Sequence, residues 1–324
     1  MKALQITDYT GAGILRYQDA DVPVPGEGQV AIEVTHAGAN YVEALFAGGF
    51  VPDLAVPWTP GIEAVGYLLG NEPLEGLGKS GDLIAALTIN GGGAYGQIAV
   101  TNAHLVKRIP AGLSPVVAAA VPSNTTTALL VIERLAKLRP GESVLVHAAA
   151  GGLGSQIGQV AKHCGAGRVV GVVGREEKRQ HALDLGYDEV WLRSELDEHL
   201  DERFDVIADP VSGPARVLSI DLLAFEGRLL VVGDAAQAGD QCISSNSLWF
   251  GGKSVLGFNL GALAAARPKL VGEYLDRALH LVADGTIRVE VTATKSIQNG
   301  ASVLEDLRSG TTIGKTVLSH ERDS

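Results

Sequence analysis

The feature that most constrains the fold of this chain is an apolar segment, a glycine-rich turn and a helical segment that follow one another over residues 143–164. From Ser143 to Gly154 the sequence reads SVLVHAAAGGLG, which matches G-x-G-x-x-G with Ala149 in place of the first glycine. In such a turn Gly151 lets the backbone approach a pyrophosphate, and Gly154 lets the helix pack closely on the strand. The helix N-terminus then offers free N–H groups to the phosphates. The pattern predicts a dinucleotide-binding turn, and the alternative is a tight turn without a ligand.

Short apolar runs continue beyond this turn and alternate with helical segments, which is typical of buried parallel strands in a doubly wound sheet. The predicted strands are 144–148, 169–173, 189–192, 205–208, 229–232 and 254–258, with helical segments at 155–164 and 175–185. Residues 1–110 instead alternate β-rich pieces with Gly and Pro, and the predicted strands there are 29–34, 61–69, 82–87 and 96–100.

Between these two regions Ser114-Pro115 has the residue types of a helix start, so residues 116–138 are expected to be helical, with a break at Pro122. A length of 324 residues suits two domains. We therefore predict an α/β fold with a β-rich domain of residues 1–114 and 285–324. A doubly wound Rossmann domain of residues 115–284 is inserted in it, and residues 310–318 return to the first domain.

Composition excludes several classes of protein. Only two cysteines, Cys164 and Cys242, are present, which argues against a disulfide framework and against a four-cysteine zinc lobe. The formal net charge is −11 and no cluster of Lys and Arg occurs, so nucleic acid is not expected as a ligand. No apolar run approaches the roughly 18–20 residues of a membrane span. No secretory leader is recognised, so a cytoplasmic location without membrane partners is expected.

The end of the second strand indicates which dinucleotide is bound. An NAD site favours Asp or Glu there, to hold the ribose 2′-hydroxyl. This chain has no carboxylate until Glu176, and the basic residues Arg175, Lys178 and Arg193 surround the expected position of a 2′-phosphate. The pattern predicts NADP(H). The alternative is a solvated helix start at which Glu176 and Glu177 pair with these bases.

Together with its neighbours, this turn resembles the medium-chain dehydrogenase/reductase superfamily, and within it the zinc-free quinone oxidoreductase branch that includes the ζ-crystallin-like proteins. The resemblance covers nearly the whole chain. The segments that carry it are Ala37–Glu43, Pro60–Gly66, Gly92–Gly96, Ile109–Pro110, Val121–Ala128, Arg139–Gly141, His147–Gly154, Gly227–Gly233 and Gly314–Leu318. It implies a GroES-like β-rich catalytic domain and hydride transfer from NADPH to a quinone or an α,β-unsaturated carbonyl compound.

The resemblance also bears on metal. Zinc-dependent relatives carry a Cys where this chain has residues 37–40, and a His before the Glu of a Gly-His-Glu motif. Here Ile62 precedes Glu63, and no cysteine lies nearby in the sequence. A catalytic zinc needs about three N, S or O ligands. We therefore expect no metal, and we expect Glu63 to be a buried or paired structural carboxylate.

The same resemblance implies a set of site residues. Asn40 lies near the nicotinamide and its ribose, Thr127 approaches the carboxamide, and Lys315 occupies the usual Gly-Lys position. The residues assigned to the cofactor are Asn40, Thr127, Ala150, Gly151, Gly152, Leu153, Gly154, Arg175, Lys178, Arg193, Gly233, Phe258, Leu260 and Lys315. The catalytic candidates are Asn40, Tyr41 and Thr127. Alternatively, Asn40 caps a helix that begins at Tyr41 and Thr127 bonds back to its own helix.

The chain departs from its relatives at the expected proton donors, because Leu45 stands where many quinone reductases carry a tyrosine and Phe50 stands where related enoyl reductases carry one. The remaining polar candidates are Tyr41, Asn90, Tyr95, Asn124 and Thr125. A quinone tolerates this loss better than an enoyl acceptor, since solvent can protonate its stable anion. Two alternatives stay open, namely an enoyl reductase of a biosynthetic pathway and a non-catalytic, crystallin-like NADPH-binding protein.

An assembly is also expected. The apolar strand 254–258 would close one edge of the Rossmann sheet, and an uncovered apolar edge invites pairing. In the superfamily that the chain resembles, two such edges commonly pair across a twofold axis. Trp249 and Phe250 lie just upstream and would add apolar contact area, unless they are core residues. We therefore predict a homodimer.

Overall fold

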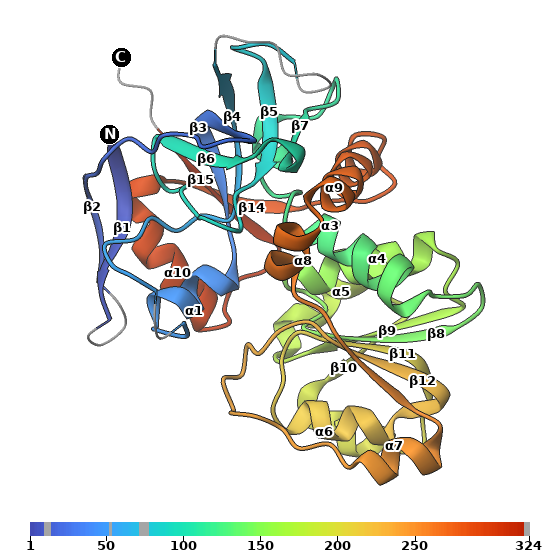
Figure 1. Cartoon of the computed structure of the whole chain (residues 1–324). Coiled ribbons are helices and arrows are strands. Elements are labelled where there is room, and N and C mark those ends of the chain that lie inside the picture. The colour runs from blue at the N-terminus through green and yellow to red at the C-terminus, as the bar shows by residue number, and fades with distance from the viewer. Residues whose placement is uncertain (10–13, 52–53, 71–77, 321–324) are drawn as a thin grey trace. The chain divides into compact units, whose positions relative to one another are not determined.

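The computed structural model describes all residues except 10–13, 52–53, 71–77 and 321–324 (Figure 1). The chain forms two compact units. Unit 1 comprises Met1–Thr126, Leu260–Gly285 and Val289–Ser324, and unit 2 comprises Thr127–Asn259 with Thr286–Arg288.

Unit 2 is built on a six-stranded parallel sheet with the order β10-β9-β8-β11-β12-β13. Its strands are β8 Ser143–His147, β9 Arg168–Val173, β10 Glu189–Leu192, β11 Phe204–Asp209, β12 Leu223–Val231 and β13 Ser254–Gly257. All six predicted strands are confirmed to within a few residues, except that β12 begins earlier than predicted. The strand order reverses between β8 and β11, and ligands of such sheets bind at the carboxyl edge at this reversal point.

Helices cover both faces of this sheet, as the prediction of a doubly wound fold requires; α6 and α7 lie on the opposite side of it from α4 (Figure 1). The helical segments of unit 2 are η2 Leu130–Ala136 (a π-helix), α4 Gly152–His163, η3 Glu176–Lys178, α5 Arg179–Asp184, η4 Arg193–His199, α6 Pro214–Asp221 and α7 Ser245–Gly251. One apolar core of this unit includes the fully buried side chains of Leu145, Ile207 and Phe204.

Unit 1 contains a seven-stranded sheet of order β14-β15-β3-β4-β5-β7, in which β6 also pairs with β3, and a separate two-stranded antiparallel sheet of β1 and β2. The strands are β1 Lys2–Asp8, β2 Ile14–Asp19, β3 Gln29–Ala39, β4 Glu63–Leu69, β5 Leu83–Leu87, β6 Ile98–Asn102, β7 Val106–Arg108, β14 Val291–Ser296 and β15 Lys315–Ser319. Because β15 pairs with β3, the prediction that the C-terminal segment returns to the first domain is confirmed. Strand β3 exceeds its predicted range since it continues past a bulge at Thr35.

The helical segments of unit 1 are α1 Tyr41–Ala47, η1 Ala103–Leu105, α2 Pro115–Ala118, α8 Leu260–Ala266, α9 Pro268–Ala283, η5 Ile297–Asn299 and α10 Gly300–Arg308. Helix α3 Asn124–Leu129 spans the division between the units. The predicted helical stretch is confirmed with its break at Pro122, and Ser114 caps α2 by accepting a hydrogen bond from Val117 N. Within the described residues, no helix is both long enough and apolar enough to cross a membrane.

The units divide at other positions than the predicted boundaries, 114/115 and 284/285. Helices α8 and α9 belong to unit 1, where α9 packs on η1 and β7. Gly272 explains the close approach, because a Cβ at that position would lie 2.0 Å from the carbonyl oxygen of His104. A helical pattern alone does not reveal which sheet its apolar face covers.

Candidate functional site

In unit 2 the glycine-rich turn joins β8 to α4 as the sequence predicts. Gly151 is the N-cap residue of α4, and Ala149 is fully buried with its N–H donated to Val172 O at 3.0 Å. A Cβ on Gly154 would lie 2.2 Å from the carbonyl oxygen of Ala148, so this position requires glycine. The first N–H groups of a helix have no partner within it. Residues 152–154 therefore present N–H donors to an anion at the carboxyl edge of the sheet.

A group of basic side chains lies at the ends of β9 and β10. Lys178 is half-buried, and its pKa is lowered first by burial and then by the neighbouring charges of Arg175 and Arg193, whereas Glu177 acts in the opposite direction. Like charges repel at this range, and an anion bound among them would reduce this repulsion. The Arg193 guanidinium lies 3.6 Å from where a Cβ of Gly174 would be, directly after β9. Arg175, Lys178 and Arg193 are thus brought together as predicted.

The alternative, in which glutamates neutralise this cluster, is met in part, because Glu177 acts on both Arg175 and Lys178. Glu176 bonds to Arg179 at 3.1 Å, outside the cluster. Glu177 approaches Arg175 only to 3.9 Å between two exposed side chains, and such a pair contributes little. Within the described part of the chain, the Arg193 side chain makes no ion pair or hydrogen bond. Its charge is therefore available to a phosphate.

A second loop at the carboxyl edge of this sheet is held by a buried ion pair. Asp209 ends β11 and accepts hydrogen bonds from Val211 N and Ser212 N at 2.7 and 2.9 Å. Arg216 bonds to Asp209 at 2.6 Å and also donates to the carbonyl oxygen of Gly233. The pair fixes the backbone at Gly233, one of the predicted cofactor residues, and sequence reasoning missed the part that Arg216 plays.

His147 at the end of β8 is a core residue and not a base. It is fully buried, and its Nε2 lies 2.8 Å from the hydroxyl of Ser219, which itself donates to Ala215 O. The histidine is therefore the donor in this contact. Burial lowers the pKa of His147 to about 4, so the imidazole is neutral at ordinary pH.

In unit 1 three side chains from adjacent strands form a closed polar network. Asn40 follows β3, Glu63 begins β4 and Lys315 begins β15. The Lys315 ammonium lies 2.7 Å from both Glu63 Oε1 and Asn40 Oδ1, and Asn40 Nδ2 lies 2.9 Å from Glu63 Oε1. All three side chains are buried. The expectation that Glu63 is a paired structural carboxylate is confirmed.

A second buried carboxylate adjoins this network. Glu43 in α1 accepts hydrogen bonds from the backbone N–H groups of Asn40 and Ile62 and from the hydroxyl of Tyr95. Burial outweighs these bonds and raises the pKa of Glu43 to about 7. Tyr95 is fully buried, which makes it a poor proton donor to a ligand. Sequence reasoning missed Glu43, although its place three residues after Asn40 is the spacing of a capping box.

The remaining predicted residues are spread over both units. In unit 2 Ala150–Gly154 lie on the turn, Gly233 follows β12 and Phe258 follows β13. Thr127 lies in α3 and is 7% exposed. In unit 1 Tyr41 begins α1 and is half-buried, whereas Leu260 begins α8 and is buried. Asn40 is the N-cap residue of α1, but its side chain is engaged by Lys315 and Glu63.

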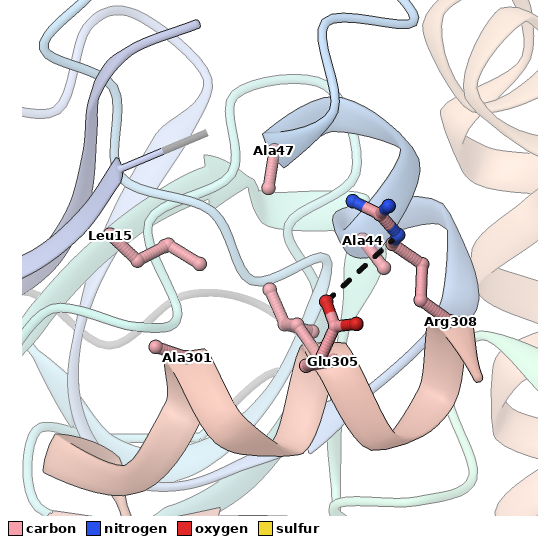
Figure 2. Close-up of a pocket in the computed structure, with 7 residues that line it drawn as sticks. Leu15, Ala44, Ala47, Ala301, Glu305 and Arg308 are labelled. Atoms are coloured by element: carbon pink, nitrogen blue, oxygen red, sulfur yellow. Dashed lines mark ion pairs between the residues drawn. The ribbon is translucent and has the colours of Figure 1, made fainter. Parts of the chain in front are cut away.

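Two hollows in unit 1 lie apart from these residues. The first has a volume of about 90 Å³ between α1 and α10, where Glu305 and Arg308 form an ion pair beside Ala44, Ala47 and Ala301 (Figure 2). The second, of about 260 Å³, is lined by Thr35, His36, Tyr67, Leu83, Pro115 and His320. Within the described ranges, no group of three or more His, Cys, Asp or Glu side chains is placed to hold a metal ion.

Comparison with known proteins adds to this geometry. Residues 152–278 match the family model described as zinc-binding dehydrogenase. A quinone oxidoreductase from Lama guanicoe is 30% identical over 243 residues, which are 72% of this chain and 73% of that protein. The quinone oxidoreductase from Thermus thermophilus, solved alone and with NADPH, is 31% identical with a TM-score of 0.83, covering 98% of this chain and 100% of that one.

Polyketide synthase GfsB from Streptomyces halstedii is also similar, with 32% identity over 295 residues. The match covers 90% of this chain but only 5% of the synthase, so the chain corresponds to a small part of that protein.

Proposed function

This chain belongs to the quinone oxidoreductase branch of the medium-chain dehydrogenase/reductase superfamily, and from that premise we propose that it transfers hydride from NADPH to a quinone or a related conjugated carbonyl compound. The observation that carries the proposal is the basic cluster of Arg175, Lys178 and Arg193 beside a glycine-rich turn that presents N–H donors. A dinucleotide with an additional phosphate is the ligand that satisfies both features.

The cofactor's parts are assigned to residues as follows. The N–H groups of residues 152–154 take the pyrophosphate, and the basic cluster takes the 2′-phosphate. Asn40, Thr127 and Lys315 serve the nicotinamide end, together with the backbone at Gly233, Phe258 and Leu260. The fit is supported by Gly154, where any side chain would collide with Ala148 O, and by the Arg216 bond that fixes the backbone at Gly233.

NADPH supplies the hydride, and the protein's task is to place the acceptor against it and to stabilise the charge that develops on the acceptor oxygen. No tyrosine stands at positions 45 or 50, and the Tyr95 hydroxyl is buried against Glu43. Tyr41 is the half-buried hydroxyl that remains as a catalytic candidate. An acceptor whose reduced anion takes its proton from solvent suits this site, and this favours a quinone.

A second candidate function is an enoyl reductase of a biosynthetic pathway, and the similarity to a segment of a polyketide synthase supports it. The test is a screen of NADPH oxidation with quinones, enones and enoyl thioesters under the same conditions. The proposal expects the highest kcat/KM with quinones. A preference for enoyl thioesters would replace it with the second candidate. NADPH binding without turnover on any acceptor would favour a non-catalytic, crystallin-like protein.

We propose that the enzyme works without zinc, although the matching family model is described as zinc-binding dehydrogenase. Ile62 stands where zinc-dependent relatives carry a ligand, and Glu63 is already bonded to Lys315 and Asn40. Exhaustive chelation is therefore expected to leave turnover and melting temperature unchanged. Stoichiometric zinc in purified protein, lost together with activity on chelation, would contradict this prediction.

We propose that the chain forms a homodimer through the edge of the Rossmann sheet. Strand β13 ends the sheet, and Phe225, Trp249 and Phe250 in unit 2 are each about three-quarters exposed. Exposed aromatic side chains of this size favour association, and so does an open strand edge. Light scattering is expected to give twice the chain mass of 33.6 kDa.

The variants that test the homodimer are chosen by how exposed their side chains are. Replacing Trp249 and Phe250 with lysine should yield a folded monomer, because neither side chain is part of the core. Val255→Lys should dissociate or unfold the protein, since Val255 also packs on the core of unit 2. Val217→Lys, at a partly exposed position in α6, is the matched control. A monomer mass for the parent protein at micromolar concentration would refute the dimer.

A cytoplasmic location is part of the same proposal, because an enzyme that consumes NADPH needs the intracellular supply of that cofactor. Its partner is the small-molecule acceptor. Neither nucleic acid nor a membrane is proposed as a partner, in keeping with a net charge of −11.

A further inference from the structure

Tyr187 is a buried tyrosine of unit 2 that has no part in the proposed function so far. It lies between α5 and β10 and is 4% exposed. Its hydroxyl donates a hydrogen bond to the carbonyl oxygen of Gly154 at 2.6 Å. Burial raises the pKa of Tyr187 above its ordinary value, although a hydrogen bond from the N–H of Gly158 acts in the opposite direction. The hydroxyl is therefore protonated at ordinary pH, and it both donates and accepts a hydrogen bond.

Both backbone partners of this hydroxyl belong to the start of α4, the helix that follows the glycine-rich turn. Gly154 and Gly158 are four positions apart in α4, which is the spacing of one backbone hydrogen bond in an α-helix. The hydroxyl thus bonds to the acceptor and to the donor of one such pair. A side chain that enters this hydrogen-bond pattern changes the direction of a helix locally. Tyr187 is therefore placed to set the direction of the first turn of α4.

The peptide group between Gly154 and Ser155 connects the tyrosine to the N-terminus of α4. Its carbonyl oxygen accepts from the Tyr187 hydroxyl, and its N–H donates to the carbonyl oxygen of Gly151 at 3.0 Å. A peptide group is planar, so a bond that fixes one end also fixes the other. Gly151 is the N-cap residue of the helix. The backbone that carries the N–H groups of residues 152–154 is therefore held in place through Tyr187.

Two glycines make room for the ring of this tyrosine. A Cβ on Gly158 would lie 2.4 Å from Tyr187 Cζ, and a Cβ on Gly171 in β9 would lie 3.0 Å from Tyr187 Cδ1. Glycine is unfavourable inside a helix or a strand, because it loses more conformational freedom on folding than other residues. The ring accounts for both glycines, since it packs against α4 and β9 in the space where their side chains would be.

We propose that Tyr187 is a positioning residue whose hydroxyl holds the first turn of α4, so that the N–H groups of residues 152–154 point at the pyrophosphate of the dinucleotide. This inference rests on the proposed function, which makes such a dinucleotide the ligand. Tyr187 acts through the backbone of α4 and does not contact the ligand. Every residue involved belongs to unit 2, so a ligand that contacts only this unit is sufficient for the test.

The test compares two ligands in the parent protein and in Tyr187→Phe, which keeps the ring and removes only the hydroxyl. The compound 2′-phosphoadenosine 5′-diphosphate carries both the 2′-phosphate and the pyrophosphate, whereas adenosine 2′-monophosphate lacks the pyrophosphate. The variant should bind the diphosphate about fivefold more weakly, roughly the effect of one hydrogen bond, and the monophosphate as the parent does. A role in stability alone would lower the melting temperature and leave both dissociation constants unchanged.

Gly158→Ala displaces the same hydroxyl by another route. The added methyl group would push the ring away from α4, so this variant should also bind the diphosphate about fivefold more weakly. Because both changes remove the same hydrogen bonds, the double variant Gly158→Ala/Tyr187→Phe should lose no more affinity than either single variant. Tyr9→Phe is the matched control. Tyr9 in unit 1 donates to the carbonyl oxygen of Leu54 at 2.9 Å, and its loss should change neither dissociation constant.

Three results would overturn the inference. They are a folded Tyr187→Phe protein that binds the diphosphate like the parent, an equal loss of affinity for both ligands, and losses that add up in the double variant. If Tyr187→Phe does not fold, Gly158→Ala decides by the first two of these criteria. A parent protein that binds neither ligand nor NADPH would overturn the proposed function as well. Binding by the parent without any effect of these variants overturns this inference alone.

Discussion

Replacing Arg175 and Arg193 together with alanine is expected to weaken NADPH binding about 100-fold and to leave NADH binding nearly unchanged. In the proposed site each guanidinium would make a charge-assisted hydrogen bond to the 2′-phosphate, and a bond of this kind contributes about 1.5–3 kcal/mol. NADH carries a hydroxyl there, so it loses little. Arg193 should account for more of the effect than Arg175, because Arg175 has Glu177 nearby. Titration of both cofactors into both proteins measures these constants.

The parent protein should already prefer NADPH over NADH by at least about tenfold, or about 1.4 kcal/mol. Arg179→Ala is the matched control. Arg179 is the next basic residue along the chain, but its guanidinium is committed to Glu176 and Glu195. This variant should melt at a lower temperature and keep the same cofactor preference. Equal affinities of the parent for NADPH and NADH would reject the assigned phosphate site.

Glu43→Gln is expected to change how stability depends on pH. The pKa of Glu43 rises from 4.5 to about 7 on folding because of burial, so the unfolded chain ionises more easily than the folded one. The raised pKa of Glu43 stabilises the folded protein fully below about pH 4.5. This stabilisation, about 3 kcal/mol in total, is lost as the pH rises to about 7. The glutamine variant lacks this titration. Relative to the parent, it should gain about 3 kcal/mol of unfolding free energy between about pH 4.5 and 8.

Urea denaturation of both proteins at several pH values measures this difference. The variant is not expected to be more stable at every pH, because glutamine cannot accept all three hydrogen bonds that Glu43 receives from Asn40, Ile62 and Tyr95. The decisive quantity is therefore how the difference in unfolding free energy between variant and parent changes with pH, and not whether that difference is positive or negative at one pH. Glu305→Gln, on the exposed side of α10, should show no such change. A constant difference between Glu43→Gln and the parent would show that folding does not raise the pKa of Glu43.

The sequence was sufficient to predict the Rossmann sheet, since its strands are continuous apolar runs between glycine turns. The turn at Gly151 and Gly154 was predictable for the same reason, because the backbone there leaves no space for a side chain. Lys315 and Asn40 are 275 positions apart, so no local pattern could reveal their bond. Resemblance placed each of them near the cofactor separately. That they share Glu63, and that Glu43 lies beside them, follows from the register of β15, β3 and β4.

The unit boundaries and the basic cluster both depend on contacts that the sequence pattern does not reveal. The predicted Rossmann domain of residues 115–284 includes the residues of α8 and α9, but these helices belong to unit 1, where Gly272 allows α9 to contact the backbone at His104. The three basic residues were predictable as a group, since each follows a predicted strand at the same edge of a parallel sheet. Which of them is neutralised by a glutamate depends on side-chain directions, and the sequence does not fix these.

The most direct test of the proposed activity is a single-turnover experiment in which protein loaded with NADPH is mixed rapidly with a quinone. NADPH absorbance should decay in step with formation of the reduced quinone, and deuterium at the transferred position of the nicotinamide should slow the decay. The Arg175→Ala/Arg193→Ala variant should give the same reaction only at much higher NADPH concentration. Bound NADPH that stays unoxidised in the presence of quinones, or that is oxidised only by enoyl thioesters, would contradict the account.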